Sequence, residues 1–235
     1  MSEGTSRPVR VMSALVIRAM VDDTILPEFR KGGSDAEMIW DPTVALLKRI
    51  GAGERADAIV AIDYAMDELT AKGLIDPATR RPVVQASVGI AVKAGAAKPD
   101  ISTAASLKQA LLDTPSLVYS RAGASGIYFE KLIDRLGIGD AVRAKATVVP
   151  AGLTAEKVAN GEVVLAIQQV SELLAVDGVD LVGPLPDEVQ ATTDFSAALF
   201  TGAVDPAGAE QFIDVLLAPK ARETYLRIGL KPLFG

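Results

Sequence analysis

Short apolar runs alternate with amphipathic segments along most of this chain. Apolar runs typical of buried strands cover residues 9–13, 38–40, 58–62, 83–92, 117–119, 147–150, 163–168, 181–184 and 195–200. Helical spacing of apolar residues covers 14–29, 44–50, 65–72, 102–112, 127–136, 154–159, 206–217 and 219–228. Strands that alternate with helices form mostly parallel sheets with helices on both faces, so the pattern predicts an α/β fold.

Two of these segments carry more specific expectations. The apolar run 83–92 predicts a strand that is interrupted at Gly89. In the helix after Asp41-Pro42-Thr43, the spacing of Val44, Leu47 and Ile50 predicts that these three residues share one buried face.

The stretch 117–136 contains the junction on which the functional interpretation depends. An apolar strand pattern is followed by the small-residue turn 122–126 and then by an amphipathic helix. The N–H groups at a helix start are unpaired and carry partial positive charge, so they favour an anion. The alternative interpretation is an ordinary strand–helix connection in which Ser125 caps the helix.

Other strands end in residues of the same chemical kind. Ligands of open parallel sheets bind at the carboxyl ends of the strands. In this chain, the predicted strand ends carry hydroxyls, carboxamides and backbone N–H groups. The candidate ligand-binding residues are Ser13, Ala14, Thr43, Ala124, Ser125, Gly126, Gly152, Leu153, Gln168 and Gln169, with Trp40, Arg121 and Tyr128 as candidate rim contacts. This set predicts anion binding by neutral hydrogen bonds. The alternatives are helix caps for the hydroxyls and a solvated pair for the two glutamines.

Composition narrows the functional classes. The chain of 235 residues is 49% hydrophobic and 23% charged, as in globular proteins, and it contains neither cysteine nor histidine. Disulfides, thiolate catalysis, a Ser-His-Asp triad and the usual zinc sites are therefore excluded, and no metal or cofactor is expected. The net charge of -6, without any basic run, argues against nucleic acid as a partner.

An internal similarity predicts two lobes. Residues 48–54 and 156–162 each end a helix with a Gly-Glu turn that leads into an apolar strand with a polar end. Such repetition is expected of two α/β lobes of similar design.

Taken in order, these segments resemble the type II periplasmic solute-binding proteins, in the molybdate-binding-like branch of ABC transporter receptors. The resemblance covers residues 9–232 and rests on the stretches VMSAL, TVALLKRIGAGERADAIVAID, GASGIYFEKLIDRLGI, AIQQVSELLAVDGVDLVGPLP and FIDVLLAPKARETYLRIGLKP. It implies two lobes, 1–84 with 190–235 and 85–189, joined by crossover strands near 84–89 and 186–192. It also implies a ligand cleft between the lobes, and places Ser13, Thr43, Ser125, the turn 151–153 and Gln169 at the family's oxyanion contacts.

The chain departs from the family pattern at two loops. Asp41-Pro42-Thr43 stands where the family has a serine-rich loop, so an N–H donor is lost and a negative charge is added. Gln168-Gln169 stands where a tyrosine is common. We therefore expect a small anion, either an oxyanion such as molybdate or a small carboxylate.

Two hypotheses for function follow. In the first, a monomeric solute-binding protein closes its lobes over the anion by hinge motion, with a transporter permease as the implied partner. In the second, the same scaffold is a cytosolic isomerase of an unsaturated polycarboxylate. Its base would be Asp41, Asp63 or Glu172, with a pKa raised by burial. A regulatory sensor lobe is a third, weaker alternative.

The N-terminus MSEGTSRPV has no apolar signal region. The expected location is thus cytoplasmic for the sequence as given, or periplasmic if a signal was removed.

Overall fold

The structure, a computed structural model, describes residues 7–235, which divide into two compact units. The first unit extends to Gln85 and also contains Asp194–Arg227 and Lys231–Gly235. The second unit contains Ala86–Thr193 and Ile228–Leu230. Strands β4 (Arg81–Lys93) and β9 (Thr192–Leu199) each contribute residues to both units.

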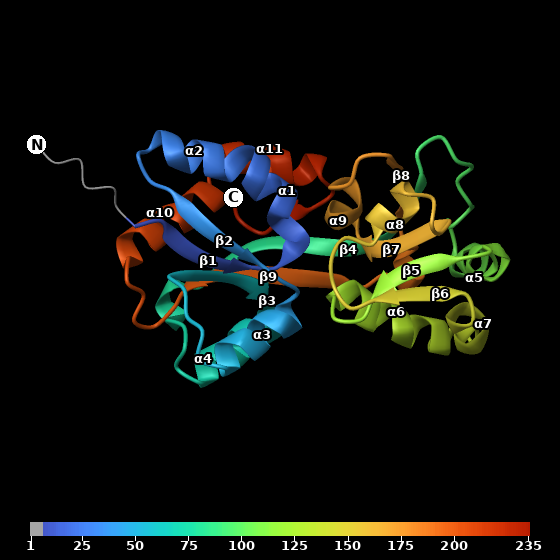
Figure 1. Cartoon of the computed structure of the whole chain (residues 1–235), viewed down its shortest axis with the longest axis horizontal. Coiled ribbons are helices and arrows are strands. Elements are labelled where there is room, and N and C mark those ends of the chain that lie inside the picture. The colour runs from blue at the N-terminus through green and yellow to red at the C-terminus, as the bar shows by residue number, and fades with distance from the viewer. Residues whose placement is uncertain (1–6) are drawn as a thin grey trace, which may run out of the picture. The chain divides into compact units, whose positions relative to one another are not determined.

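The first unit is built on three parallel strands, β1 (Val9–Ser13), β2 (Ala36–Trp40) and β3 (Ala58–Ile62), with β1 in the middle. Strand β9 joins β3 antiparallel, and the short β10 (Lys231–Pro232) joins β4. Helices α3 (Thr43–Gly51) and α4 (Asp63–Ala71) cover one face of this sheet (Figure 1). The other face is covered by α1 (Arg18–Met20), α2 (Leu26–Lys31), α10 (Pro206–Leu216) and α11 (Pro219–Arg227).

The second unit repeats this design. Strand β5 (Leu117–Ser120) lies parallel to and between β6 (Ala146–Val149) and β7 (Leu165–Gln169), while β4 pairs antiparallel with β7 and with β8 (Val179–Pro184). One core, beneath α5 (Ala104–Asp113), α6 (Ala124–Arg135) and α7 (Gly139–Arg143), contains Leu165 and Ile167 of β7. A second core contains Ala166, with residues of α8 (Ala155–Ala159) and α9 (Val170–Leu174).

Helix boundaries follow local sequence signals. Thr103 and Ser106 form a reciprocal capping box at the start of α5. Asp205 caps α10 by accepting a hydrogen bond from the Gly208 N–H, and Pro206 occupies its first turn. The segment predicted as one helix over 14–29 is helical but irregular, because a 3₁₀ turn (Leu15–Ile17) and a π turn (Val21–Ile25) flank α1.

Two detailed predictions were wrong. Strand β4 continues through Gly89, where a Cβ would lie 2.9 Å from the carbonyl oxygen of Gly183, so glycine here permits close approach of β8. In α3 the buried residues are Thr43, Leu46 and Ile50, while Val44 is exposed. The spacing of apolar residues is compatible with burial of either of two neighbouring faces of α3. Packing against the sheet buries the face with Leu46 and Ile50.

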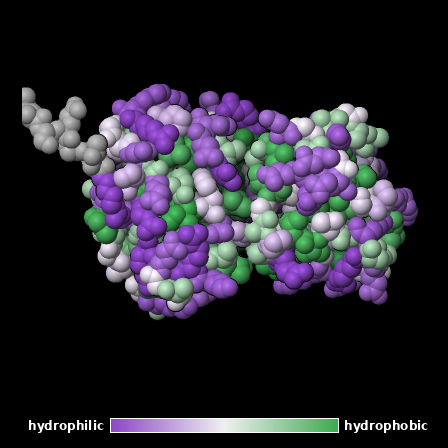
Figure 2. All heavy atoms as spheres, viewed as in Figure 1, coloured by the Kyte–Doolittle hydropathy of each residue, from purple (hydrophilic) through white to green (hydrophobic). Residues whose placement is uncertain are grey.

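Polar side chains cover the outer surfaces of helices such as α2 in the face drawn in Figure 2. No helix within residues 7–235 has the length and apolar character needed to span a membrane.

Candidate functional site

The structure brings the candidates of the first unit to one edge of its sheet. Strands β1 and β2 are parallel, and Ser13 is paired with Trp40 where both strands end. Thr43 begins α3 shortly after β2, and Asp63 begins α4 directly after β3. The helix starts and strand ends therefore lie at the same edge, as in other open parallel sheets.

Thr43 is the polar group of this edge that is free to bind. Its Oγ1 is buried without a hydrogen-bond partner in the described part of the chain. By contrast, Ser13 Oγ donates to the carbonyl of Ala14 at 3.0 Å, and the Ala14 N–H donates to the carbonyl of Val60 at 2.9 Å. Ser13 and Ala14 thus already have backbone partners, whereas the Thr43 hydroxyl has none.

The two acidic side chains near this edge are both neutralised. Asp41 Oδ2 accepts a hydrogen bond from Arg49 Nη1 at 2.7 Å. Asp63 Oδ1 accepts a hydrogen bond from Ser196 Oγ at 2.5 Å and lies 3.2 Å from Arg80 Nη2. The negative charge expected from Asp41 is therefore balanced within the unit, and neither carboxylate is free to act as a base.

In the second unit, the turn between β5 and α6 is shaped by two glycines. The Gly123 N–H donates to Ser120 Oγ at 2.8 Å, and Gly126 packs directly on the carbonyl of Ser120. Ser125, next to Gly126, is buried. Gly126 is therefore required for packing of α6 against the end of β5, a role that the sequence pattern did not distinguish from close approach of a ligand.

The start of α6 has the features of an anion site. As the first N–H groups of a helix, those of Ala124, Ser125 and Gly126 have no partner within the helix. Arg121, just before this turn, is exposed and has no ion pair with any described residue. Because α6 is a full twelve-residue helix, its dipole adds to the attraction for negative charge.

The two glutamines at the end of β7 differ in role. Gln168 Oε1 accepts hydrogen bonds from the N–H of Thr154 (2.7 Å) and from its hydroxyl (2.8 Å). Its Nε2 donates to the carbonyl of Gly152 at 3.0 Å. Gln168 thereby holds the loop that contains Gly152 and Leu153, a link to Thr154 for which the sequence carried no signal.

Gln169 is the less satisfied of the pair. Its Oε1 is buried without a hydrogen-bond partner in the residues that the structure describes. Because side chains alternate along a strand, Gln169 lies on the same face of β7 as Ile167, which packs in one core with Phe129 of α6. Its amide thus faces the side of the sheet that α6 covers.

Tyr128 has a structural partner. Its hydroxyl donates to the carbonyl of Val189 at 2.5 Å and accepts a hydrogen bond from Arg135 Nη2 at 3.0 Å. These contacts connect α6 with the 3₁₀ turn Asp187–Val189. The side chain proposed as a rim contact therefore already stabilises the second unit.

Glu172 is the unusual carboxyl group of the second unit. Burial raises its pKa to about 7, although hydrogen bonding by the backbone N–H of Gln169 and by the Gln168 side chain opposes the shift. No ion pair joins Glu172 to another described residue. Of the three carboxyls weighed as bases, Glu172 alone combines a raised pKa with the absence of a cationic partner.

Comparison with known families gives one match over most of the chain. A family model described as "Bacterial extracellular solute-binding protein" matches residues 9–231. The aconitate isomerase of a Pseudomonas species is 35% identical over 199 residues, which are 84% of this chain and 76% of the relative.

Solved structures share the fold. A periplasmic molybdate-binding protein from Azotobacter vinelandii has a TM-score of 0.78 at 15% identity, covering 94% of this chain and 98% of its own. The sulfate-binding protein SubI from Mycobacterium tuberculosis has a TM-score of 0.74 at 14% identity, covering 96% of this chain and 87% of its own. The predicted α/β fold of the type II periplasmic-binding class is thereby confirmed.

Proposed function

This chain belongs to the family of bacterial extracellular solute-binding proteins, and we propose that it binds a small polycarboxylate anion of the aconitate type. The observation that carries the proposal is the start of α6. Unpaired helix N–H groups, the buried Ser125 and the unpaired Arg121 there combine in one short segment.

A planar carboxylate fits these donors better than a tetrahedral oxyanion does. An arginine guanidinium binds a carboxylate through two parallel hydrogen bonds, and helix N–H groups bind a second carboxylate. Pro42 at the start of α3 has no N–H to give to an oxyanion. The 35% identity with an aconitate isomerase supports the same ligand class, whereas the molybdate- and sulfate-binding proteins share only the fold.

Closure of the two units over the ligand, which the resemblance to the family implies, is part of this proposal. Thr43 in the first unit and Ser125 in the second unit are both buried hydroxyl residues, and each is proposed as a ligand contact of its own unit. We also propose a transporter permease as the partner of this protein.

We expect aconitate or citrate to raise the thermal stability of the protein, while molybdate and sulfate do not. A ligand present at about 100 times its Kd adds roughly 2.7 kcal/mol to the free energy of unfolding. Arg121→Ala should weaken binding by roughly 10- to 100-fold, since a hydrogen bond to a charged group contributes about 1.5–3 kcal/mol. Differential scanning fluorimetry and calorimetric titration measure both effects.

Lys131→Ala is the matched control. Lys131 is an exposed cation on the same helix, without an ion pair to any described residue, and lies about two turns from the start of α6. Its loss should leave affinity unchanged within about twofold, because salt screens charges beyond about a Debye length. Equal losses for both variants, or stabilisation by molybdate instead of carboxylates, would contradict the proposal.

A second candidate function is isomerisation of an unsaturated polycarboxylate. The relative at 35% identity supports it, and so does the unpaired carboxyl of Glu172. Both candidates require the same ligand class, so binding is the step to establish first.

A further inference from the structure

We propose that Gln168 is a positioning residue of the ligand site in the second unit. Its carboxamide holds the loop 150–154 at the carboxyl end of β5, so that free N–H groups of this loop bind a further carboxylate of the ligand. The start of α6, at the same end of β5, binds the rest of the molecule. The inference rests on the proposed function and adds a residue that acts on the ligand through the loop.

The loop 150–154 passes the carboxyl end of β5 because of the strand order. Strand β5 lies between β6 and β7, and all three strands are parallel. The chain leaves β6 at Val149 and enters α8, which packs against β7 on the other side of β5. The loop must therefore cross the end of β5.

The start of α6 lies at this same end. Arg121 directly follows β5, and its N–H donates to the carbonyl of Val149, the last residue of β6, at 2.8 Å. Helix α6 then covers the face of the sheet that carries Leu165 and Ile167, whereas α8 covers the face that carries Ala166. The turn before α6 and the loop before α8 thus begin side by side and leave the end of β5 on opposite faces.

Gln168 fixes the far end of this loop. Its oxygen accepts from the N–H and the hydroxyl of Thr154, at 2.7 and 2.8 Å, and its nitrogen donates to the Gly152 carbonyl at 3.0 Å. Among the described residues, this last bond is the only one that joins 151–153 to a strand. Because Gln168 is 2% exposed and Thr154 is fully buried, bulk water does not compete for the bonds between them.

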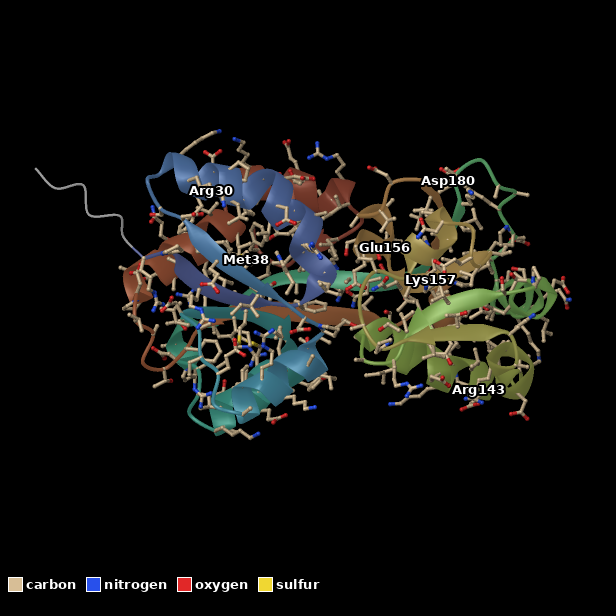
Figure 3. All side chains as sticks on the ribbon, viewed as in Figure 1. Arg30, Met38, Arg143, Glu156, Lys157 and Asp180 are labelled. Carbon is tan, nitrogen blue, oxygen red and sulfur yellow. The ribbon has the colours of Figure 1, made fainter. Side chains whose placement is uncertain are left out.

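The carbonyls and the N–H groups of the loop differ in how they are bonded. The N–H groups of Glu156 and Lys157, both labelled on α8 in Figure 3, donate to the carbonyls of Leu153 (3.3 Å) and Thr154 (3.1 Å). With the Gly152 carbonyl already bound, these three carbonyls are all occupied. The N–H groups of Gly152 and Leu153, by contrast, have no acceptor in the part of the chain that the structure describes. Successive free N–H groups favour an anion.

The neighbouring Gln169 independently indicates a ligand at this end. In the parallel pair of β5 and β7, Val118 is level with Ala166, so Arg121 is level with Gln169. The Gln169 side chain is 3% exposed, and its Oε1 has no partner among the described residues. Buried polar atoms are nearly always hydrogen-bonded, so a bound molecule is expected to complete this amide. Rotation of the carboxamide by half a turn presents its NH₂ group, the donor that a carboxylate needs.

The test is made on the full chain with trans-aconitate as the probe. Calorimetric titration measures affinity, and hydrogen–deuterium exchange measures how far the ligand protects the loop amides. Gln168→Met keeps the length of the side chain but removes its hydrogen bonds. We expect this variant to lower affinity by about 10- to 100-fold, the effect of losing hydrogen bonds to a charged group. Aconitate should protect residues 151–154 in wild type and not in this variant, a difference that a purely structural role would not produce.

Two further variants separate positioning from stability. Thr154→Val removes the hydroxyl that bonds to Gln168 but keeps the N–H bond, so it should lower affinity by only about 3- to 10-fold. Thr114→Val is the matched control, because its buried hydroxyl donates to the Ser116 carbonyl at 3.0 Å just before β5 begins, at the opposite end of the strand. It should lower Tm and yet leave affinity and loop protection unchanged within about twofold.

Wild-type affinity of Gln168→Met would overturn the inference and leave the proposed function intact. The same follows if wild type binds aconitate without protection of the loop, or if Thr114→Val loses as much affinity as Gln168→Met. If Gln168→Met does not fold, Thr154→Val decides, and full affinity of that variant overturns the inference. Absence of aconitate binding by wild type would overturn the proposed function and the inference together.

Discussion

Gly126→Ala is expected to destabilise the protein by about 3 kcal/mol or more, which corresponds to a fall in Tm of roughly 6–12 °C. A Cβ at this position would lie 1.6 Å from the carbonyl oxygen of Ser120. The Cβ is fixed by the backbone of α6 and the oxygen belongs to the backbone of β5, so no side-chain rotation relieves the contact and the start of α6 must move away from β5. Thermal and urea unfolding measure the loss.

Gly51→Ala provides the contrast. Gly51 ends α3, and no heavy atom lies within 4 Å of the position its Cβ would take. Alanine is favoured over glycine in helices by about 1 kcal/mol, so this variant should be neutral or slightly stabilised. If Gly126→Ala behaved like Gly51→Ala, the tight packing of α6 on Ser120 would be disproved. Weaker aconitate binding by a folded Gly126→Ala would further support the role of this helix start.

Asp57→Ala is expected to cost about 3–5 kcal/mol of unfolding free energy. Asp57 is only 1% exposed, and its carboxylate accepts hydrogen bonds from Arg7 Nη2 (2.6 Å) and the Arg10 N–H (2.8 Å). It also accepts from the N–H groups of Val204 (2.8 Å) and Asp205 (3.1 Å). Truncation leaves all of these donors without their acceptor and removes the link between three segments of the first unit.

The contribution of Asp57 should depend on pH. Burial alone raises the pKa of Asp57, but its backbone hydrogen bonds and Arg7 outweigh burial, so the pKa is lowered below the usual value. The stability gained from the ionised form is therefore present above about pH 4, the value for an unfolded aspartate, and is lost as pH falls through the folded pKa. Urea unfolding between pH 7 and pH 3 should show this loss for wild type and not for Asp57→Asn.

Asp23→Asn serves as the control for this pH series. Asp23 is exposed in the same unit and makes no ion pair with a described residue. Its replacement should change stability by less than about 0.5 kcal/mol. A pH dependence of Asp57→Asn identical to that of wild type would show that other carboxyls cause the acid loss.

The order of strands and helices could be predicted because each element carries its own signal. Continuous apolar runs mark the strands buried on both faces, as in β3 and β7. Capping residues and glycines mark helix ends, as Thr103 and Asp205 do. Helical phase was not determined locally, and Val44 was wrongly placed on the buried face for this reason.

The strand ends that carry the candidate residues were predictable, and the contacts of those residues were less so. Strand ends followed by small or hydroxyl residues identify the edge of a parallel sheet. Ser13 and Thr43 could therefore be placed at the edge of the first unit's sheet, and Ser125 at the edge of the second unit's sheet. Whether a polar atom is free depends on partners distant in the sequence. Gln168 is bound by Thr154, and Asp63 by Ser196, through contacts across 14 and 133 positions.

The sequence by itself determined the fold class, the absence of histidine and cysteine chemistry, and the places where strands end and helices begin. These properties follow from composition and from patterns within one or two turns of helix. Only the tertiary structure decided that Asp41 and Asp63 are neutralised, that Gly126 serves packing, and that Glu172 has a raised pKa. Charge balance, close packing and desolvation depend on neighbours that folding brings together. A local sequence pattern therefore cannot predict these three properties.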